Sequence, residues 1–400
     1  MISQNDISVK FVSKLNKDCR LVIPKNFATK FKDGKIKLGF KLIRNVRRPK
    51  SFKKHSKLDI LAFIPVKTLS GFEVLAFQNG NQIFAWYFAS KGRPNEILLN
   101  RRLDYDFARL LGYYRSEGGK PRISIRRGRE FSFTNKSVKL VLDFLNLFKK
   151  LTSSDFLKAS IRHNPKIDKQ AIEELRKVLI QNGLKSDNIK DSQAERIREF
   201  VIKLYVTNSL LSEIIDNAEN ILRNYLNKNF DKNLTLEYLR GVLSGDGSFY
   251  SYRDKKGSLH SRLLIFESNE RAIEDVSVLL KRLGIEGKVK PAKSKMFIFD
   301  RSLNWNKLLI LISLNLFHLD KEQLCETIKK HKRFKSMKYL SQISKNFTIS
   351  ELIPIIPYPS NWLDKRMKEG IVEITKNKEM HLSYKLTNEG ERIATILKSL

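Results

Sequence analysis

One short phrase occurs twice in this chain and constrains its fold more than any other feature. Residues 110–118 and residues 239–247 both read Leu-x-Gly-x-x-x-x-acid-Gly, so Glu117 and Asp246 occupy the same place in the two copies. Each copy has the apolar spacing of a helix and is followed by two short strands and a further helix. The sequence therefore predicts an internal structural repeat in an α+β fold.

Each copy also carries a glycine in the middle of its helix. Such a glycine costs about 1 kcal/mol relative to alanine, so matched glycines at Gly112 and Gly241 need a structural reason. We expect the two helices to pack side by side with their backbones in contact there. If they run parallel, Glu117 and Asp246 meet at the negative ends of both helix dipoles. Paired carboxylates of this kind suit Mg²⁺; the alternative is two amphipathic helices ending in solvated acids.

On these residues the sequence resembles the LAGLIDADG homing endonuclease family in its single-chain, two-motif form, over roughly residues 103–333. The resemblance implies two pseudo-symmetric αββαββα repeats whose sheets form a saddle on double-stranded DNA. It implies that Glu117 and Asp246 bind divalent metal, Mg²⁺, and cleave the two strands. It also implies a monomer with internal pseudo-twofold symmetry and no small-molecule cofactor.

Three more residues match the family pattern in the first repeat. The phrase FTNKS places Asn135 and Lys136 beside the metal site, as candidates to position solvent and to stabilise charge on the phosphate. Lys120, three residues after the first acid, is a second basic candidate. In the second repeat Glu267 stands where the amide would fall, and no lysine follows it. For Lys120 and Lys136, a plain phosphate contact or a surface position is an equal alternative.

The charge of the chain indicates the kind of partner. It has 77 Lys and Arg against 42 Asp and Glu, a net charge of +35, which favours nucleic acid; compositional bias is the alternative. The longest apolar run, residues 308–317, is too short to span a bilayer, so no membrane partner is expected. Its two cysteines exclude a disulfide scaffold. A polar start without a secretion signal predicts a cytoplasmic, nucleoid-associated protein.

Two further domains are predicted to flank the repeats, giving the boundaries 1–100, 101–232, 233–333 and 334–400. The first is β-rich and holds 20 Lys and Arg against 6 Asp and Glu. The last has the order helix, helix, strand, turn, strand, helix, which is typical of a winged helix-turn-helix, with residues 359–369 as its recognition helix. A winged helix binds either DNA or protein, and both alternatives stay open.

Cations in the flanking domains and on the predicted strand faces are candidate DNA contacts, because Lys and Arg bind phosphate and Arg reads guanine edges. They are Arg44, Arg47, Arg48, Lys50, Lys53, Lys54, Arg122, Arg126, Arg253, Arg262, Lys365 and Arg366.

The sequence thus predicts a site-specific, metal-dependent double-strand DNA endonuclease of homing type. The alternative is a non-catalytic DNA-binding transcription regulator built on the same core, which the flanking domains favour. An RNA-splicing maturase is a third possibility. The presence of both acids favours the nuclease, because a protein that only reads DNA has no need of two carboxylates beside phosphates.

Overall fold

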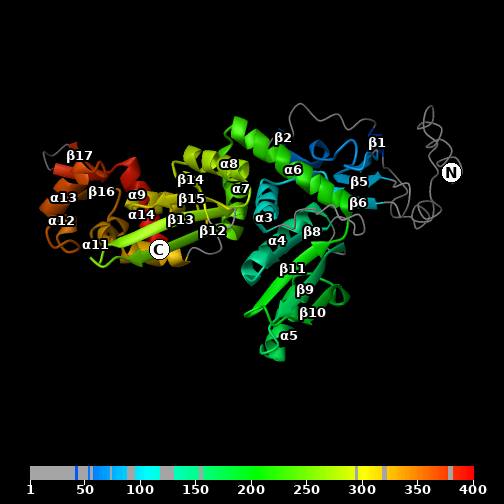
Figure 1. Cartoon of the computed structure of the whole chain (residues 1–400). Helices are drawn as coiled ribbons and strands as arrows, with labels where there is room; N and C mark the ends of the chain where they lie inside the picture. Colours follow the sequence, from blue (N-terminus) through cyan, green and yellow to red (C-terminus); the bar gives the residue numbers. More distant parts are fainter. Residues whose placement is uncertain are drawn as a thin grey trace, which may run out of the picture.

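The structure is a computed structural model that describes residues 41–43, 53–54, 57–72, 74–87, 95–117, 130–152, 156–292, 296–317, 322–376 and 382–400. Its helices and strands form an α+β fold, as expected. The two repeats lie on either side of a central helix pair (Figure 1). The N-terminal strands lie beside the first repeat, and the C-terminal residues lie at the far end of the second. Among the described helices, none is both long and apolar enough to cross a bilayer.

The second repeat has the complete αββαββα order. Its elements are α7 (Lys232–Gly245), β12 (Gly247–Arg253), β13 (Leu259–Glu267), α8 (Glu270–Arg282), β14 (Lys288–Pro291), β15 (Phe297–Ser302) and α9 (Trp305–Ser313). The strands form one antiparallel sheet in the order β12-β13-β15-β14. Helix α8 packs on β13, β14 and β15 through buried residues such as Ile273 and Leu280, and so covers one face of the sheet.

The first repeat has the same core with an insertion. Its elements are α3 (Phe107–Glu117), β8 (Phe131–Asn135), α4 (Val138–Leu151), β9 (Lys158–His163), α5 (Lys169–Gln181), β10 (Ile189–Gln193), β11 (Phe200–Val206) and α6 (Ser209–Lys228). The sheet order is β10-β9-β11-β8, so β8, β11 and β9 take the places of β13, β15 and β14. The inserted β10 pairs in parallel with β9 at the outer edge of the sheet. The predicted strand at residues 122–126 lies outside the described residues.

The described residues before α3 are mostly strands. They are β1 (Lys41–Ile43), β2 (Lys53–Lys54), β3 (Lys57–Asp59), β4 (Leu75–Asn79), β5 (Gln82–Tyr87), β6 (Asn95–Asn100) and β7 (Arg102–Leu103). One sheet has the order β1-β4-β5-β6 and a smaller one the order β2-β3-β7. Asn217 on α6 donates a hydrogen bond of 2.7 Å to the carbonyl of Phe63, and Glu213 accepts one of 3.0 Å from the backbone N–H of Leu69. These contacts attach the N-terminal strands to the first repeat.

Helix α10 (Glu322–Lys330) follows α9 and packs on α9 and β12 of the second repeat. The residues after it form a further group of helices around a small sheet. They are α11 (Lys332–Met337), β16 (Asn346–Thr348), α12 (Ile349–Leu352), α13 (Pro359–Lys368), β17 (Val372–Lys376), β18 (Leu382–Leu386) and α14 (Asn388–Lys398). The strands are ordered β16-β18-β17. Thr387 caps α14 by accepting a hydrogen bond of 3.2 Å from the N–H of Gly390. The winged-helix assignment of this group stays a prediction.

Candidate metal centre and nucleic-acid interface

Helices α3 and α7 are in direct backbone contact at the two matched glycines. A Cβ atom built on Gly112 would lie 2.2 Å from the carbonyl oxygen of Tyr238, and one built on Gly241 would lie 2.2 Å from the carbonyl oxygen of Arg109. Real Cβ atoms essentially never come within 3.0 Å of another heavy atom in this way, so neither position accepts a side chain. The glycines therefore determine how closely the helices approach each other.

The two helices also end together. Helix α3 ends at Glu117, and α7 ends at Gly245 with Asp246 as its C-cap residue. A Cβ on Gly245 would lie 2.2 Å from Oγ of Ser116 and 2.7 Å from Cγ of Glu117. The residue before Asp246 thus touches Glu117, and the helices run parallel. Both acids lie at the C-terminal ends of their helices, where the helix dipole is negative and destabilises an ionised carboxylate. A bound cation would offset this destabilisation.

The carboxyl group of Glu117 has one polar side-chain partner among the described contacts. Nδ2 of Asn135 donates a hydrogen bond of 3.1 Å to Oε1 of Glu117, while Oδ1 of Asn135 accepts one of 2.8 Å from the N–H of Ser137. The amide is therefore held in a fixed orientation. Burial raises the pKa of Glu117, and the hydrogen bond from Asn135 opposes that rise. A carboxylate that is costly to ionise gains from a nearby cation.

The available donors fit a small divalent cation. Glu117 and Asp246 provide two carboxylates, and Mg²⁺ typically takes one or two from the protein and keeps water and substrate phosphate as its other ligands. In the part of the chain that the structure describes, no three His, Cys, Asp or Glu residues come together as a ligand group. The donor set therefore fits a metal that binds jointly with phosphate.

Glu117 opens onto a hollow of about 390 Å³ on the sheet of the first repeat. Lys203 lines this hollow, and its Nζ forms an ion pair of 2.5 Å with Glu130. The lining residues are Ser116, Glu117, Ser132, Thr134, Arg162, Ile197, Val201 and Lys203. The hollow therefore connects the first acid with cationic and hydroxyl side chains.

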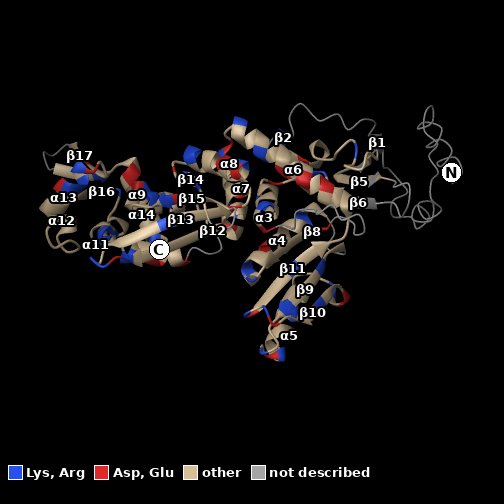
Figure 2. Cartoon of the chain, in the orientation of Figure 1, with Lys and Arg blue, Asp and Glu red and all other residues tan. Residues whose placement is uncertain are grey.

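The same cations belong to an open, basic sheet face. In the strand register Thr134 lies opposite Lys203, and Arg162 lies opposite Val201. These side chains alternate with the buried Ile161. The open face carries Ser132, Thr134, Lys158, Ser160, Arg162, Lys190, Lys203 and Tyr205. Lys and Arg lie along β9 and β10 (Figure 2).

The four cations of this face, Lys158, Arg162, Lys190 and Lys203, are not among the sequence-based candidates. The alternation of β9 and β11 with buried Ala159 and Leu204 is the signal that indicates the three on these two strands.

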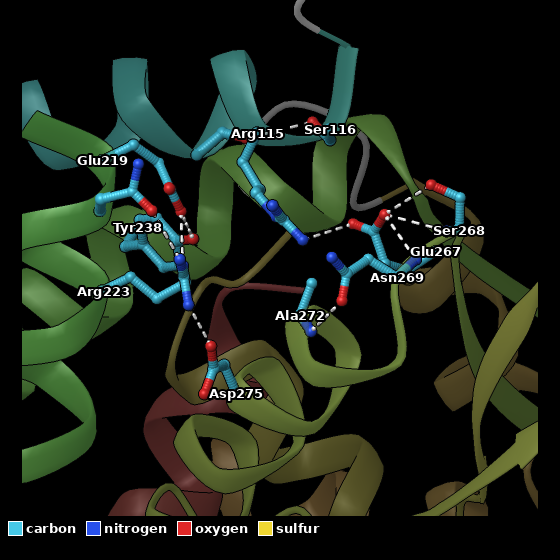
Figure 3. A network of polar contacts seen from close by, with 12 residues as sticks. Arg115, Ser116, Glu219, Arg223, Tyr238, Glu267, Ser268, Asn269, Ala272 and Asp275 are labelled. Carbon is cyan, nitrogen blue, oxygen red and sulfur yellow. Dashed lines mark hydrogen bonds and ion pairs between the residues drawn. The ribbon is translucent and has the colours of Figure 1, made fainter. Parts of the chain in front are cut away.

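The second repeat differs where its amide would stand. Glu267 forms an ion pair of 2.8 Å with Arg115 on α3, so this contact links the second repeat to the first (Figure 3). Its other carboxylate oxygen accepts a hydrogen bond of 2.9 Å from the N–H of Ser268. On α7 the place of Arg115 is taken by Ser244, whose hydroxyl donates instead to the carbonyl of Arg240 at 2.7 Å. The two halves of the centre are therefore chemically unequal.

Arg262, a predicted DNA contact, lies on the open face of the second sheet. Its Nε donates to Oδ1 of Asp300 at 3.1 Å, and Lys290 forms an ion pair of 2.7 Å with the same carboxylate. One acid thus serves two cations, which lowers the positive charge of this face relative to the first repeat.

Arg253 does not lie on that face. It follows the strand beyond Ser251, on the side of β12 covered by α10, where the Ser251 hydroxyl is 2.9 Å from that of Thr327. The guanidinium of Arg253 donates to the carbonyl of Gly257 at 2.8 Å and to that of Lys330 at 3.5 Å. The expectation that Arg253 reads bases beside Arg262 is wrong, because successive strand residues point to opposite faces.

Two other predicted DNA contacts are occupied by acids. Lys53 forms an ion pair with Asp231, the N-cap residue of α7. The hydrogen bond between these two side chains is the largest cause of the raised pKa of Lys53. Arg366 is 1% exposed and forms an ion pair of 2.6 Å with Glu369, so it does not reach a DNA surface. The expectation of a direct DNA contact is therefore corrected for Arg366, and Lys53 is engaged within the protein.

The remaining predicted site residues differ in whether the structure describes them. Lys136 and Lys365 are exposed. The side chain of Lys54 is not described. Outside the described residues lie Lys120, Arg44, Arg47, Arg48, Lys50, Arg122 and Arg126.

Comparison with known proteins agrees with this geometry. A family model described as a LAGLIDADG-like domain matches residues 233–308. Among curated proteins, no relative matches the chain.

Solved structures with some likeness include two DNA complexes and one protein domain. I-DmoI in complex with DNA and Mn shares 17% identity over 53% of this chain and 97% of its own, with a TM-score of 0.30. The N-terminal LAGLIDADG domain of DUF199/WhiA shares 15% over 58% and 86%, with a TM-score of 0.31. The meganuclease I-SmaMI bound to uncleaveable DNA shares 13% over 66% and 95%, also with a TM-score of 0.31. Likenesses this weak do not indicate a function.

The fold and the family match together define the class. Residues 233–308 are a LAGLIDADG-like domain with a complete αββαββα order, which confirms the resemblance seen in the sequence. The chain joins this domain, through the Gly112–Gly241 contact, to a second unit whose described strands β8, β11 and β9 are ordered like β13, β15 and β14.

Proposed function

We propose that this chain is a site-specific, Mg²⁺-dependent endonuclease that cleaves both strands of double-stranded DNA as a monomer. The observation that carries the proposal is the contact between Gly245 and Glu117, which brings the acids of both repeats to one end of the helix pair. The LAGLIDADG-like family match over residues 233–308 supports it. The proposed place of action is the cytoplasm, at nucleoid DNA.

The roles of the residues follow from their surroundings. Glu117 and Asp246 would hold the metal, and Asn135 keeps the Glu117 carboxylate oriented through its 3.1 Å hydrogen bond. When bound, Mg²⁺ neutralises charge on the phosphate and lowers the pKa of a coordinated water. Lys136 is exposed one residue beyond Asn135 and is proposed to stabilise phosphate charge.

The DNA surface is proposed to be the pair of open sheet faces. Arg162 and Lys203 line the hollow next to Glu117, where they would bind the phosphates of the strand being cut. Arg262 would act on the other side of the centre. Lys365 and the basic N-terminal residues are proposed to add contacts from the flanking domains, whose proposed boundaries are those predicted from the sequence.

The test is cleavage of a plasmid library by the purified chain in Mg²⁺. Metal-dependent breaks at defined sites are expected for the wild-type protein and are expected to vanish in Glu117→Gln and in Asp246→Asn. Glu274→Gln is a matched control, because Glu274 is exposed on the outer side of α8. Cleavage that persists in both acid variants would reject the proposal.

The second candidate function is a non-catalytic DNA-binding regulator. The observation in its favour is the ion pair between Arg115 and Glu267, which occupies the second repeat's equivalent of the Asn135 position. Under this alternative the wild-type chain binds DNA without cutting it. Neutralising either acid would then strengthen binding, because repulsion from phosphate is removed.

A further inference from the structure

The open face of the second repeat carries a row of aromatic rings. Tyr250 and Tyr252 project from the same side of β12, with ring centroids 6.1 Å apart and planes within 18°. Across the sheet Tyr252 pairs with His260 of β13, at 5.2 Å and 20°. Three nearly parallel rings therefore stand together on one sheet surface.

This row is accessible to a ligand. The Tyr252 side chain is 47% exposed, and His260 is also exposed. His260 is kept in place by Asp254, whose carboxylate lies 2.9 Å from its Nε2. The rings thus form a fixed surface, and nearly half of Tyr252 is exposed to solvent.

Positive charge lies at the end of the row. Residues 254–258 form the turn between β12 and β13, and the exposed Lys255 and Lys256 lie in that turn, directly beyond Tyr252. Arg262, by contrast, lies directly opposite Tyr250 in the strand register and is paired with Asp300. Aromatic rings beside a short basic turn are the combination that binds a strand with exposed bases, since bases stack on the rings and Lys binds the phosphates.

The position of the row separates it from the metal centre. Tyr252 comes five residues after Gly247, the neighbour of Asp246, along the same strand β12. At roughly 3.4 Å per residue this is about 17 Å. A substitution at Tyr252 therefore leaves both acids and their helices intact.

We propose that Tyr250, Tyr252 and His260, with Lys255 and Lys256, form a stacking site for unpaired bases of a single-stranded nucleic acid segment. In a duplex the base faces are covered by neighbouring bases, so only an unpaired strand offers a face to these rings. The proposal does not depend on cleavage, and it holds for a nuclease and for a regulator alike.

The test is fluorescence anisotropy without divalent metal, so that no strand is cut. A labelled single strand, in DNA and RNA versions, and the matching DNA duplex are titrated with the wild type, Tyr252→Ala, Tyr252→Phe and Phe230→Ala. Phe230 is the control, because it is 49% exposed and lies just before α7, at the end of that helix opposite Asp246. Circular dichroism and thermal unfolding show that each variant is folded.

Loss of one stacked base predicts at least about fivefold weaker single-strand binding by Tyr252→Ala. Duplex affinity should fall by a clearly smaller factor than single-strand affinity, because a duplex lying on this open face offers no base face for stacking. Tyr252→Phe and Phe230→Ala should bind as the wild type does. A stronger effect on the RNA strand or on the DNA strand supports the site and identifies the preferred sugar.

Three results would overturn the proposal. The first is a wild-type protein that binds neither single strand. The second is a Tyr252→Ala variant that binds single strands as tightly as the wild type or loses duplex affinity equally. The third is a Phe230→Ala variant that loses as much affinity as Tyr252→Ala. Absence of cleavage in the plasmid assay would reject the nuclease and leave this result unaffected.

Discussion

Arg115 on α3 and Glu267 at the end of β13 form an ion pair of 2.8 Å that links the first repeat to the second. Both side chains are largely buried, at 12% and 11% exposure. Glu267 takes the place that Asn135 has in the first repeat, so the pair is also the clearest departure from symmetry at the metal centre. The contribution of this ion pair to the stability of the folded chain can be measured.

Removal of either partner leaves the other charge largely buried and without this ion pair. We expect Arg115→Met to lower the free energy of unfolding by about 2 to 4 kcal/mol, measured by urea denaturation. The double variant Arg115→Met, Glu267→Gln should cost less than the sum of the two single variants, because no charge is then stranded. Strict additivity would show that the two residues do not interact.

The helix contact predicts a steric effect at both glycines. Gly112→Ala and Gly241→Ala each place a methyl group against a backbone carbonyl at 2.2 Å, and neither carbonyl can rotate away. Each should cost about 1 to 3 kcal/mol or more of unfolding free energy and reduce any cleavage. Gly257→Ala is the control, since a Cβ there meets nothing within 4 Å and only the backbone angle is unfavourable. Wild-type stability in Gly112→Ala would contradict the packing.

The raised pKa of Glu117 predicts a pH-dependent stability. Because burial raises this pKa in the folded chain, the folded state binds the proton more tightly than the unfolded state does. The associated stabilisation is present below the ordinary Glu pKa and is lost as the pH rises through the folded value. At neutral pH Glu117→Gln should therefore unfold at a higher temperature than the wild type, and the difference should shrink in acid. A difference that grows in acid has the wrong sign.

Metal binding should restore the folding stability that is lost when Glu117 ionises. Ca²⁺ or Mg²⁺ at about 100 times its Kd is expected to stabilise the wild type by about 2.7 kcal/mol. This gain should be small in Glu117→Gln and in Asp246→Asn but complete in the exposed control Glu274→Gln. Thermal unfolding with and without metal gives the answer, and equal gains in all four proteins would place the metal elsewhere.

The basic face of the first repeat predicts a change in salt dependence. Arg162 is exposed on this face and lines the hollow at Glu117. If it binds one phosphate, Arg162→Ala should reduce the slope of log affinity against log salt by about 0.9 for duplex DNA. Lys330→Ala is the control, because Lys330 lies on α10 at the closed side of β12 and pairs with Glu326 at 3.1 Å. An equal reduction in the control would show a diffuse charge effect.

Local sequence was sufficient to predict the centre of the molecule. The two phrases share spacing as well as residue type, so they predict the contact between Gly112 and Gly241 and the common end of their helices. Asn135 is indicated by the likeness of the phrase FTNKS to the family pattern, and its Nδ2 lies 3.1 Å from Oε1 of Glu117. These relations depend on residues near one another in the chain or at matching places in a repeat.

The contacts that could not be predicted from the sequence join residues that lie far apart in the chain. Nothing near Lys53 indicates that it pairs with Asp231, 178 residues away. Arg366 is polar in a helix expected to face DNA, yet it is buried beside Glu369. Residues 190–193 are polar and exposed, without the apolar alternation of a strand, yet together with Ile189 they form β10, because one edge of β9 offers backbone hydrogen-bonding groups.

The most direct test of the account is the position of a bound metal. A crystal of the chain soaked in Mn²⁺ should show one or more anomalous difference peaks at the joined ends of α3 and α7, in contact with the carboxylates of Glu117 and Asp246. The peaks should disappear in the variant Glu117→Gln, Asp246→Asn. A wild-type crystal with no anomalous peak at these two residues, or with the strongest peak elsewhere, would contradict the account.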